Sequence, residues 1–436
     1  MMNKRKSLAV YLHIPFCRSK CKYCDFLSFG GLDETVQAAY GEALCREIRG
    51  FSGMALSYSV SSIFFGGGTP SYVRAAVIEK ILCTLREVFD VEEDCEITLE
   101  GNPDSLTPDK LRAYRQIGIN RLSIGLQSLR DDLLKTLGRV HDRDQFMRAY
   151  AQAREAGFSN INVDLMSGLP GESGESYLKT LEGVLSLKPE HISAYSLIVE
   201  EGTPLSEDAG LLALLPGEEE ERLQYRKTKE LLRDNGYERY EISNYARKGF
   251  ACRHNRVYWT MGEYLGLGLG ASSFLGLVPE LTIRKTDKNS EKNVPSYKVG
   301  ESTESGVALR ETGQEKRIRF RGEQDLAAYL ECFGAETAGY SIPEELIRDK
   351  YQDIVTLDLK DEIEEYMFLG LRMINGISRR DFRQRFGQDP EVLYGDVINR
   401  YLENGLLLEK EDRLFLSDRG LDVSNVVMAD FLLDRD

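Results

Sequence analysis

Residues 17–24, CRSKCKYC, carry three thiols with the spacing Cys-x3-Cys-x2-Cys, directly after an apolar run that extends from Leu8 to Phe16. Thiolates are soft ligands that select zinc, copper(I) or iron–sulfur clusters, and a cubane cluster normally takes one thiolate on each of its four irons. With three local thiols, a [4Fe-4S] cluster on Cys17, Cys21 and Cys24 keeps one iron open. The carboxylate and amine of an amino acid can chelate that iron.

Two other uses of these thiols have to be weighed. A structural zinc site needs four ligands, and His13 could provide the fourth, so zinc stays open on the local sequence. A disulfide is disfavoured, because nothing indicates an oxidising compartment. The remaining cysteines have no regular spacing; they are Cys45, Cys83, Cys95, Cys252 and Cys332. The first three lie in helical patterns or at a strand start and are expected to be small buried hydrophobic residues.

Length and charge exclude several classes of protein. The chain has 436 residues, a net charge of −15 and a pI near 5.0, which argues against nonspecific nucleic-acid binding. No apolar stretch is long enough to span a bilayer. The basic start and apolar run at the N-terminus are interrupted by His13 and Pro15, so we expect a first strand and not a signal peptide. The sequence predicts a cytoplasmic protein that is at most peripheral at a membrane.

Short β-branched or aromatic runs alternate with amphipathic ones up to about Ile198, which is typical of βαβ units. Helices are expected between the strands, for example Asp33–Arg49 and Asp142–Ala156. Six such units predict an α/β fold, an open partial (β/α)6 barrel of the TIM type. The predicted strands are Leu8–Ile14, Val60–Phe65, Glu96–Leu99, Arg121–Gly125, Asn160–Leu165 and His191–Leu197.

The unusual residues fall at the C-terminal ends of these strands, where barrels of this kind place their reactive groups. The cysteines follow the first strand, GGGTP (66–70) the second, Glu100 the third and Gln127 the fourth. Taken alone, the glycines could form a simple turn and Glu100 a solvated strand end. Asp164 is harder to dismiss, because a carboxylate inside an apolar strand must find a partner or change its protonation.

YLHIPFC (11–17), followed by Cys-x3-Cys-x-aromatic-Cys, resembles the signature of the radical SAM superfamily. Within it, the chain is similar to the family that contains oxygen-independent coproporphyrinogen III oxidases and HemW heme chaperones. The resemblance implies a radical SAM barrel with a [4Fe-4S] cluster and S-adenosylmethionine (SAM). Residues in the matching motifs bind SAM in this family, and the matches here are Tyr11, Gly67, Gly68, Thr69, Glu100, Gln127, Arg139 and Asp164.

These assignments make chemical sense. Glycine backbone can approach and hydrogen-bond the methionyl amine, a carboxylate can hold ribose hydroxyls or the amine, and Arg139 can meet the SAM carboxylate. Without the resemblance, Arg139 would pass for an exposed residue at a helix end. Tyr11 and Tyr23 are expected to pack near the cluster and the adenine.

The segment CRHNRVYW (252–259) holds the only tryptophan of the chain. A histidine beside aromatic residues is more often a packed core residue than a ligand. However, His-Asn-x-x-Tyr-Trp resembles a motif of HemW-like proteins that is associated with heme binding. Heme iron accepts imidazole or thiolate, so the resemblance makes His254 the first candidate for an accessible, exchangeable heme site and Cys252 the second. The following glycine-rich segment 266–274 is expected to be a close-approach loop.

Four regions are predicted: a radical SAM partial barrel (1–200), a segment that completes the barrel and carries the heme motif (201–277), a flexible polar insertion (278–320) and a C-terminal domain (321–436). The last resembles a winged helix, with helices followed by a hairpin-like stretch. DNA binding is disfavoured there, because residues 361–436 contain 10 Lys and Arg against 17 Asp and Glu. We therefore expect a lid or contact domain.

Two functions within the resembling family compete. The oxidases carry a fourth cysteine two positions after the third, where this chain has Phe26, and an N-terminal extension that is expected to be missing here. With the His254 motif, this favours a HemW-like heme chaperone that binds heme and hands it to acceptor hemoproteins, membrane-bound cytochromes among them. The oxidase is the alternative, and a radical SAM methyltransferase is a third. SAM turnover and a homodimer stay open.

Overall fold

The computed structural model describes residues 5–276, 317–334 and 343–433, which divide between two compact units. The first unit runs to Phe274 and also includes Arg319–Ile354 and Arg372–Ile374. The second consists mainly of Val355–Leu371 and of residues from Asn375 onward. Most of the predicted polar insertion, residues 278–316, lies outside the described residues.

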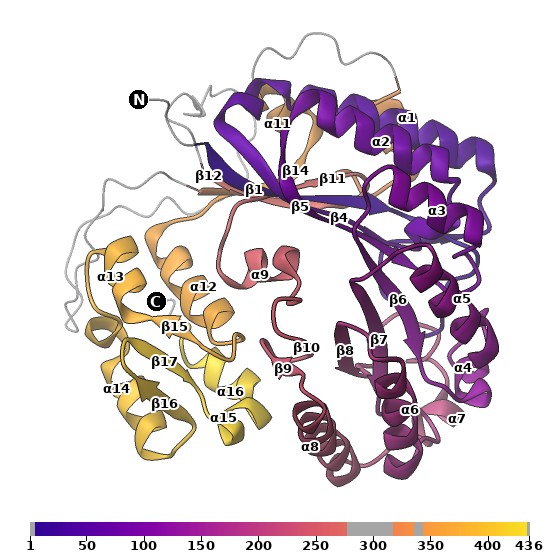
Figure 1. Cartoon of the computed structure of the whole chain (residues 1–436). Helices are drawn as coiled ribbons and strands as arrows, with labels where there is room; N and C mark the ends of the chain where they lie inside the picture. Colours follow the sequence, from indigo (N-terminus) through magenta and orange to yellow (C-terminus); the bar gives the residue numbers. More distant parts are fainter. Residues whose placement is uncertain (1–4, 277–316, 335–342, 434–436) are drawn as a thin grey trace. The chain divides into compact units, whose positions relative to one another are not determined.

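A twelve-stranded sheet forms the framework of the first unit and curves around its concave side (Figure 1). Its strands are ordered β14 (Gln352–Thr356), β13 (Arg317–Arg321), β12 (Ser272–Gly276), β11 (Tyr264–Leu267), β1 (Lys6–Ile14), β4 (Tyr58–Gly67), β5 (Asp90–Gly101), β6 (Arg121–Gln127), β7 (Ile161–Ser167), β8 (His191–Ser196), β10 (Asn244–Ala246) and β9 (Glu238–Arg239).

The six predicted strands correspond to β1 and β4–β8, which are consecutive neighbours and pair in parallel. The predicted α/β fold with a partial barrel is therefore confirmed. The glycine-rich segment 266–274 differs from the predicted loop, because β11 pairs in parallel with β1 and β12 pairs with β11. A Cβ on Gly266 would lie 2.1 Å from the carbonyl oxygen of Ser272, so the glycine permits this tight strand reversal.

Helices cover the outer, convex face of the sheet, whereas α9 (Arg253–Trp259) lies on its concave side (Figure 1). The predicted helix ends are confirmed where caps define them: Asp33 accepts from the amides of Thr35 and Val36, and Asp142 forms a capping box with Gln145. The outer helices are α1 (Glu34–Gly50), α2 (Ala75–Val88), α3 (Pro108–Gln116), α4 (Asp131–Thr136), α5 (Arg143–Glu155), α6 (Gly174–Leu187) and α8 (Glu218–Asp234).

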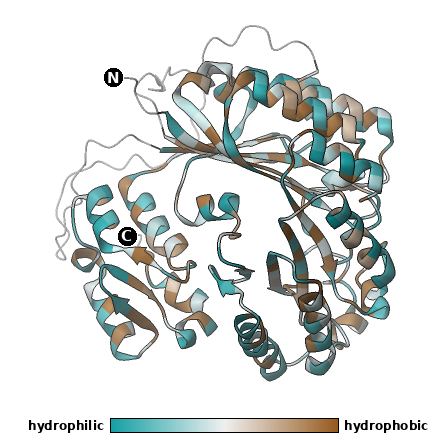
Figure 2. Ribbon diagram, viewed as in Figure 1, coloured by the Kyte–Doolittle hydropathy of each residue, from teal (hydrophilic) through white to brown (hydrophobic). Residues whose placement is uncertain are grey.

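Helix α8 is largely hydrophilic (Figure 2) and begins with four consecutive glutamates. Its buried face is narrow and consists of Gln224, Thr228 and Leu232. Short elements complete the first unit: β2 (Phe16–Cys17) pairs with β3 (Phe29–Gly30) around the cysteine loop, and α7 (Ala209–Leu212), α10 (Leu326–Cys332) and α11 (Pro343–Lys350) lie in connecting regions.

The predicted domain boundary at residue 321 differs from the observed one, because Arg319–Ile354 belongs to the first unit. The buried carboxylate of Glu47 on α1 explains why. It accepts hydrogen bonds from the hydroxyls of Tyr329 (2.7 Å) and Tyr351 and from the amide of Gly268 (2.8 Å). These contacts join residues between 221 and 304 positions apart, so no local pattern revealed them.

Glu47 should make stability depend on pH. Burial raises its pKa to about 7, so between its unfolded value and pH 7 the folded state binds more protons than the unfolded state, and stability falls as pH rises. From pH 5 to pH 8, the free energy of unfolding should fall by on the order of 3 kcal/mol more in the wild type than in Glu47→Gln. Chemical denaturation at both pH values measures this. Glu182→Gln, at an exposed position on α6, is the control; equal pH dependence in Glu47→Gln and the wild type would contradict the assignment.

The second unit contains the predicted winged-helix-like arrangement. A small antiparallel sheet, ordered β15-β17-β16, accompanies the helices, and the β16–β17 hairpin corresponds to the predicted hairpin-like stretch. Its core includes the ring cluster of Tyr366, Phe382 and Phe386. The elements are α12 (Leu359–Gly370), β15 (Ile377–Ser378), α13 (Arg379–Phe386), α14 (Pro390–Glu403), β16 (Leu407–Lys410), β17 (Arg413–Leu416), α15 (Asp418–Asp422) and α16 (Ser424–Ala429). None of the helices in the described ranges has the length and hydrophobicity that crossing a membrane requires.

Candidate functional site

A cavity of about 340 Å³ lies at the C-terminal ends of the parallel strands. We call it the cysteine cavity, because the three thiols of residues 17–24 line it. Most of the residues that the sequence singled out line it as well, from five different strand ends and the loops that follow them. They are Tyr23, Gly67, Gly68, Thr69, Glu100, Gln127, Arg139 and Asp164.

The cysteine loop is fixed by contacts with neighbouring strand ends. The hydroxyl of Thr69 lies 3.4 Å from the sulfur of Cys17, and Arg139 Nη1 lies 3.6 Å from the sulfur of Cys21. Burial raises the pKa of Cys17 and of Cys24 and thus favours their protonated thiol forms; a bound metal would offset this effect, because it binds the thiolate. Among the described residues, no three His, Cys, Asp or Glu side chains surround a point for one metal ion. A cubane bonds each thiolate to a different iron, which suits thiols that line a shared cavity.

His13 does not fit the zinc alternative. Its Nε2 lies 2.8 Å from the carbonyl oxygen of Leu27 and its Nδ1 lies 3.1 Å from the hydroxyl of Tyr11. Both ring nitrogens are thus engaged within the protein. The imidazole hydrogen-bonds the backbone at Leu27, just after the cysteine loop, and does not offer a fourth ligand.

The glycine turn after β4 packs against the start of the cysteine loop. The amide of Gly68 donates to the carbonyl oxygen of Ile14 (2.9 Å) and that of Thr69 to the carbonyl oxygen of Phe16 (2.8 Å). A Cβ on Gly68 would lie within 2.9 Å of backbone atoms of Ile14 and Phe16. Glycine is therefore required by this close approach of two backbones.

Two carboxyl groups with perturbed pKa values line the cavity. Desolvation, and then the nearby charge of Asp164, raise the pKa of Glu100 to about 8. Desolvation also raises the pKa of Asp164, which accepts hydrogen bonds from Ser123 (2.9 Å) and Asn162 (2.8 Å). Paired carboxyls of this kind can accept from hydroxyls or an ammonium group of a ligand and exchange a proton as it binds.

Arg139 is half-buried and not the exposed helix-end residue that local sequence would suggest. Its Nη2 donates to Asn102 Oδ1 (2.7 Å) and to the carbonyl oxygen of Gly125 (2.6 Å), while Nη1 faces Cys21. Its Nε is buried without a partner. Most of the guanidinium therefore holds the cysteine loop to β6.

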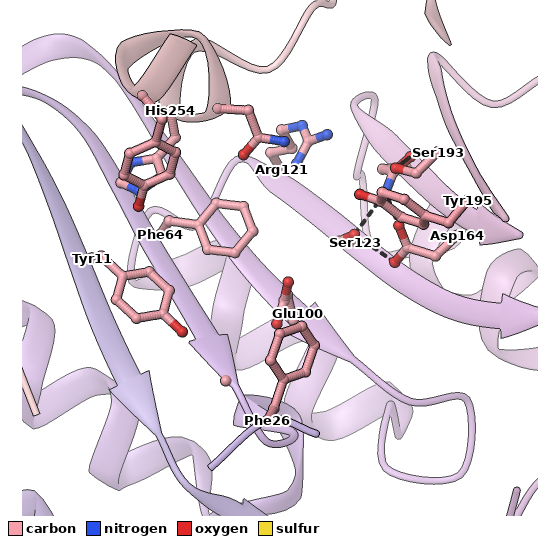
Figure 3. Close-up of a pocket in the computed structure, with 14 residues that line it drawn as sticks. Tyr11, Phe26, Phe64, Glu100, Arg121, Ser123, Asp164, Ser193, Tyr195 and His254 are labelled. Atoms are coloured by element: carbon pink, nitrogen blue, oxygen red, sulfur yellow. Dashed lines mark hydrogen bonds between the residues drawn. The ribbon is translucent and has the colours of Figure 1, made fainter. Parts of the chain in front are cut away.

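A second cavity of about 240 Å³, here called the aromatic cavity, lies beside the first. The two share Phe26, Gly67, Glu100, Asp164 and two further lining residues, Ser123 and Tyr195. Figure 3 shows its aromatic side, formed by Tyr11, Phe64 and His254, facing Glu100. The rings of Phe64 and His254 stack with centroids 5.1 Å apart.

His254 differs from the predicted accessible imidazole. It has no exposed surface; its Nδ1 lies 3.0 Å from Ser62 Oγ and its Nε2 lies 2.8 Å from the hydroxyl of Tyr258. Burial lowers its pKa to about 3, so the ring is neutral. Cys252, also fully buried, donates towards Glu96. An accessible site is expected of a protein that must release its heme, but α9 turns His254 towards Ser62 of β4.

Sequence reasoning missed Arg121. In β6, Arg121, Ser123, Gly125 and Gln127 alternate with leucine and isoleucine, and alternation places them on one face of the sheet. That face is the concave one, since Arg121 and Ser123 line the aromatic cavity. An arginine on the interior face of a barrel strand was the available signal.

Comparisons with known proteins agree with this architecture. The model of the radical SAM superfamily matches residues 11–184, and that of the HemN C-terminal domain matches residues 357–423. The chain is 32% identical over 432 residues to the heme chaperone HemW of Lactococcus lactis. The alignment covers 99% of this chain and 98% of that protein. It is 31% identical to HemW of Bacillus subtilis, over 97% and 99% of the two chains.

Among solved structures, the coproporphyrinogen III oxidase HemN of Escherichia coli, a radical SAM enzyme, superposes with a TM-score of 0.75 over 98% of this chain and 90% of that one. At 21% identity this likeness shows the fold. The partial barrel with its three-cysteine loop thus defines the class of radical SAM proteins, whose members use a [4Fe-4S] cluster and SAM. Within this class, the chain belongs to the family of the heme chaperone HemW.

Proposed function

We propose that the protein is a heme chaperone, which binds heme and transfers it to acceptor hemoproteins while carrying a [4Fe-4S] cluster and SAM. The observation that carries this proposal is the similarity to HemW heme chaperones over essentially the whole length of both chains. Membrane-bound cytochromes as acceptors, peripheral membrane association and a homodimer belong to the same proposal.

The cluster is assigned to Cys17, Cys21 and Cys24, with SAM beside it at the strand ends. This is supported by the shared cavity of the three thiols and by the residues that line it, Glu100, Gln127, Arg139 and Asp164 among them. Gly67, Gly68, Thr69 and Tyr23 also line this cavity, and Tyr11 lines the neighbouring aromatic cavity. When bound, the cluster offers an open iron and a source of electrons; the chain's own groups hold and orient SAM.

Asp164→Asn should weaken SAM binding about tenfold to hundredfold, because a charge-assisted hydrogen bond to the ligand is lost. Iron and sulfide content should remain unchanged, since Asp164 is not a cysteine ligand. Equilibrium dialysis of anaerobically reconstituted protein measures the affinity. Asp109→Asn, on the exposed side of α3, should bind like wild type; an Asp164→Asn protein with wild-type affinity would remove this residue from the site.

The oxidase is the competing function. Phe26 occupies the position of its fourth cysteine, is 63% exposed and lines both cavities. A phenyl ring there replaces a thiol by an apolar face that suits contact with a porphyrin. The deciding experiment titrates heme into reconstituted protein and measures coproporphyrinogen III consumption, with SAM and a reductant, in the same sample. Heme binding without consumption supports the chaperone, whereas turnover of coproporphyrinogen III supports the oxidase.

His254 as heme ligand would require Tyr258 to turn away, because the tyrosine hydroxyl occupies Nε2. We therefore expect Tyr258→Phe to bind heme more tightly than wild type, by roughly three- to tenfold for one neutral hydrogen bond released. His254→Ala should lose the corresponding absorption band, while Cys252→Ala should keep it. Absorption titrations with heme measure all three; unchanged spectra in His254→Ala would exclude the imidazole.

A further inference from the structure

Arg121 begins β6 and is 2% exposed, which makes it one of the largest fully buried side chains. Its side chain lines the aromatic cavity, where Figure 3 shows it between His254 and Ser123. Its Nε is buried without a hydrogen-bond partner, and no carboxylate of the described residues forms an ion pair with it. A buried cation without a direct partner is costly, so this position is expected to serve a ligand.

The neighbouring carboxylates are directed elsewhere. Glu96 accepts from the sulfur of Cys252 (3.4 Å) and from the amide of His254 (3.2 Å). Asp164 accepts from Ser123 and Asn162. These acids balance the charge of Arg121 at a distance and leave its planar donor group directed at the cavity. A guanidinium with free donors matches a carboxylate, which it can bind with two parallel hydrogen bonds.

Arg139 does not offer the same opportunity. Both of its terminal nitrogens face groups of the protein, namely Asn102, the Gly125 carbonyl and the sulfur of Cys21. Arg139 lines the cysteine cavity, whereas Arg121 lines the aromatic cavity. The two arginines thus differ in role: Arg139 holds the cysteine loop, whereas Arg121 is available to bind a ligand.

We propose that Arg121 is a carboxylate receptor, which binds the carboxylate of a ligand that reaches into the aromatic cavity. With a volume of about 240 Å³, this cavity is smaller than the pockets that enclose drug-sized molecules. It accommodates a side arm or an amino acid group and not a porphyrin ring. The inference rests on the proposed function for its two ligand sources, a propionate of heme or the methionyl carboxylate of SAM.

The test compares each acid with an analogue that lacks the carboxylate: heme with its dimethyl ester, and SAM with decarboxylated SAM. Binding is measured by absorption titration and by equilibrium dialysis, for wild type, Arg121→Met and Arg121→Lys. Arg112→Met, at an exposed position of α3, is the matched control. Thermal unfolding and iron content are recorded for each variant.

Arg121→Met should bind one of the two acids about tenfold to hundredfold more weakly, and the corresponding analogue with unchanged affinity. Arg121→Lys should lose less, because an ammonium keeps the charge without the two-pronged geometry, and it carries the test if the Met variant does not fold. Loss for heme alone identifies a propionate, and loss for SAM alone identifies the methionyl carboxylate.

Equal losses for acid and analogue, or no loss for either acid, would overturn the receptor and make Arg121 a counter-charge for Glu96 and Asp164. A failure of the proposed function gives a different result from a failure of the receptor. If wild-type protein does not bind heme but its affinity for SAM depends on Arg121, the chaperone is wrong and the receptor stands. If it binds heme and the Arg121 variants bind both heme and SAM as tightly as wild type does, the receptor is wrong and the chaperone stands.

Discussion

Cys21→Ala protein, reconstituted anaerobically with iron and sulfide, is expected to contain essentially no [4Fe-4S] cluster. Three thiolates are available in residues 17–24, and with two of them a cubane would leave two irons without a protein ligand. Arg139, which lies 3.6 Å from the sulfur of Cys21, would lose that contact as well. Iron and sulfide analysis together with the absorbance of the cluster measures the result.

Cys83→Ala is the matched control. The helical pattern predicts that Cys83 is buried, but it is an exposed free thiol on α2, outside both cavities. It should assemble the cluster as wild type does. Equal cluster content in Cys21→Ala and wild type would refute the assignment. So would stoichiometric zinc without iron–sulfur absorbance in the wild type.

Gly68→Ala should disturb both stability and SAM binding. The added Cβ would lie 2.8 Å from the carbonyl oxygen of Phe16 and 2.9 Å from that of Ile14, and backbone atoms cannot move aside as a flexible side chain can. Overpacking of this kind costs about 1–3 kcal/mol or more. Because the turn adjoins Cys17, we expect a lower melting temperature and at least tenfold weaker SAM binding.

Gly217→Ala separates this clash from a general effect of replacing glycine. Gly217 precedes α8 with an ordinary backbone conformation, and a Cβ there would meet nothing within 4 Å. Its melting temperature and SAM affinity should match those of the wild type. If Gly68→Ala had the same melting temperature and SAM affinity as Gly217→Ala, the turn would be able to accommodate the Cβ without loss of stability or binding.

The sequence by itself determined the barrel and the edge of the sheet at which the cysteine cavity lies. Hydrophobic runs of strand length alternate with amphipathic helices, and parallel strands bring all their C-terminal ends to one edge of a sheet. Local patterns were therefore sufficient to predict that Cys17, Gly68, Glu100, Gln127 and Asp164 meet. They line one cavity, as expected.

Only the tertiary structure decided which polar groups already have partners. The residue pattern left open whether His254 is a packed core residue or an accessible heme ligand, and contacts with Ser62 and Tyr258 occupy both of its nitrogens. No sequence pattern indicated that Tyr329 and Tyr351 donate hydrogen bonds to Glu47, which attach residues 319–354 to the first unit. Nor did it reveal that Arg121 lacks a direct partner. Strand and helix periodicity depends on residues a few positions apart, whereas burial and hydrogen bonding depend on contacts between distant segments, which form only when the chain is folded.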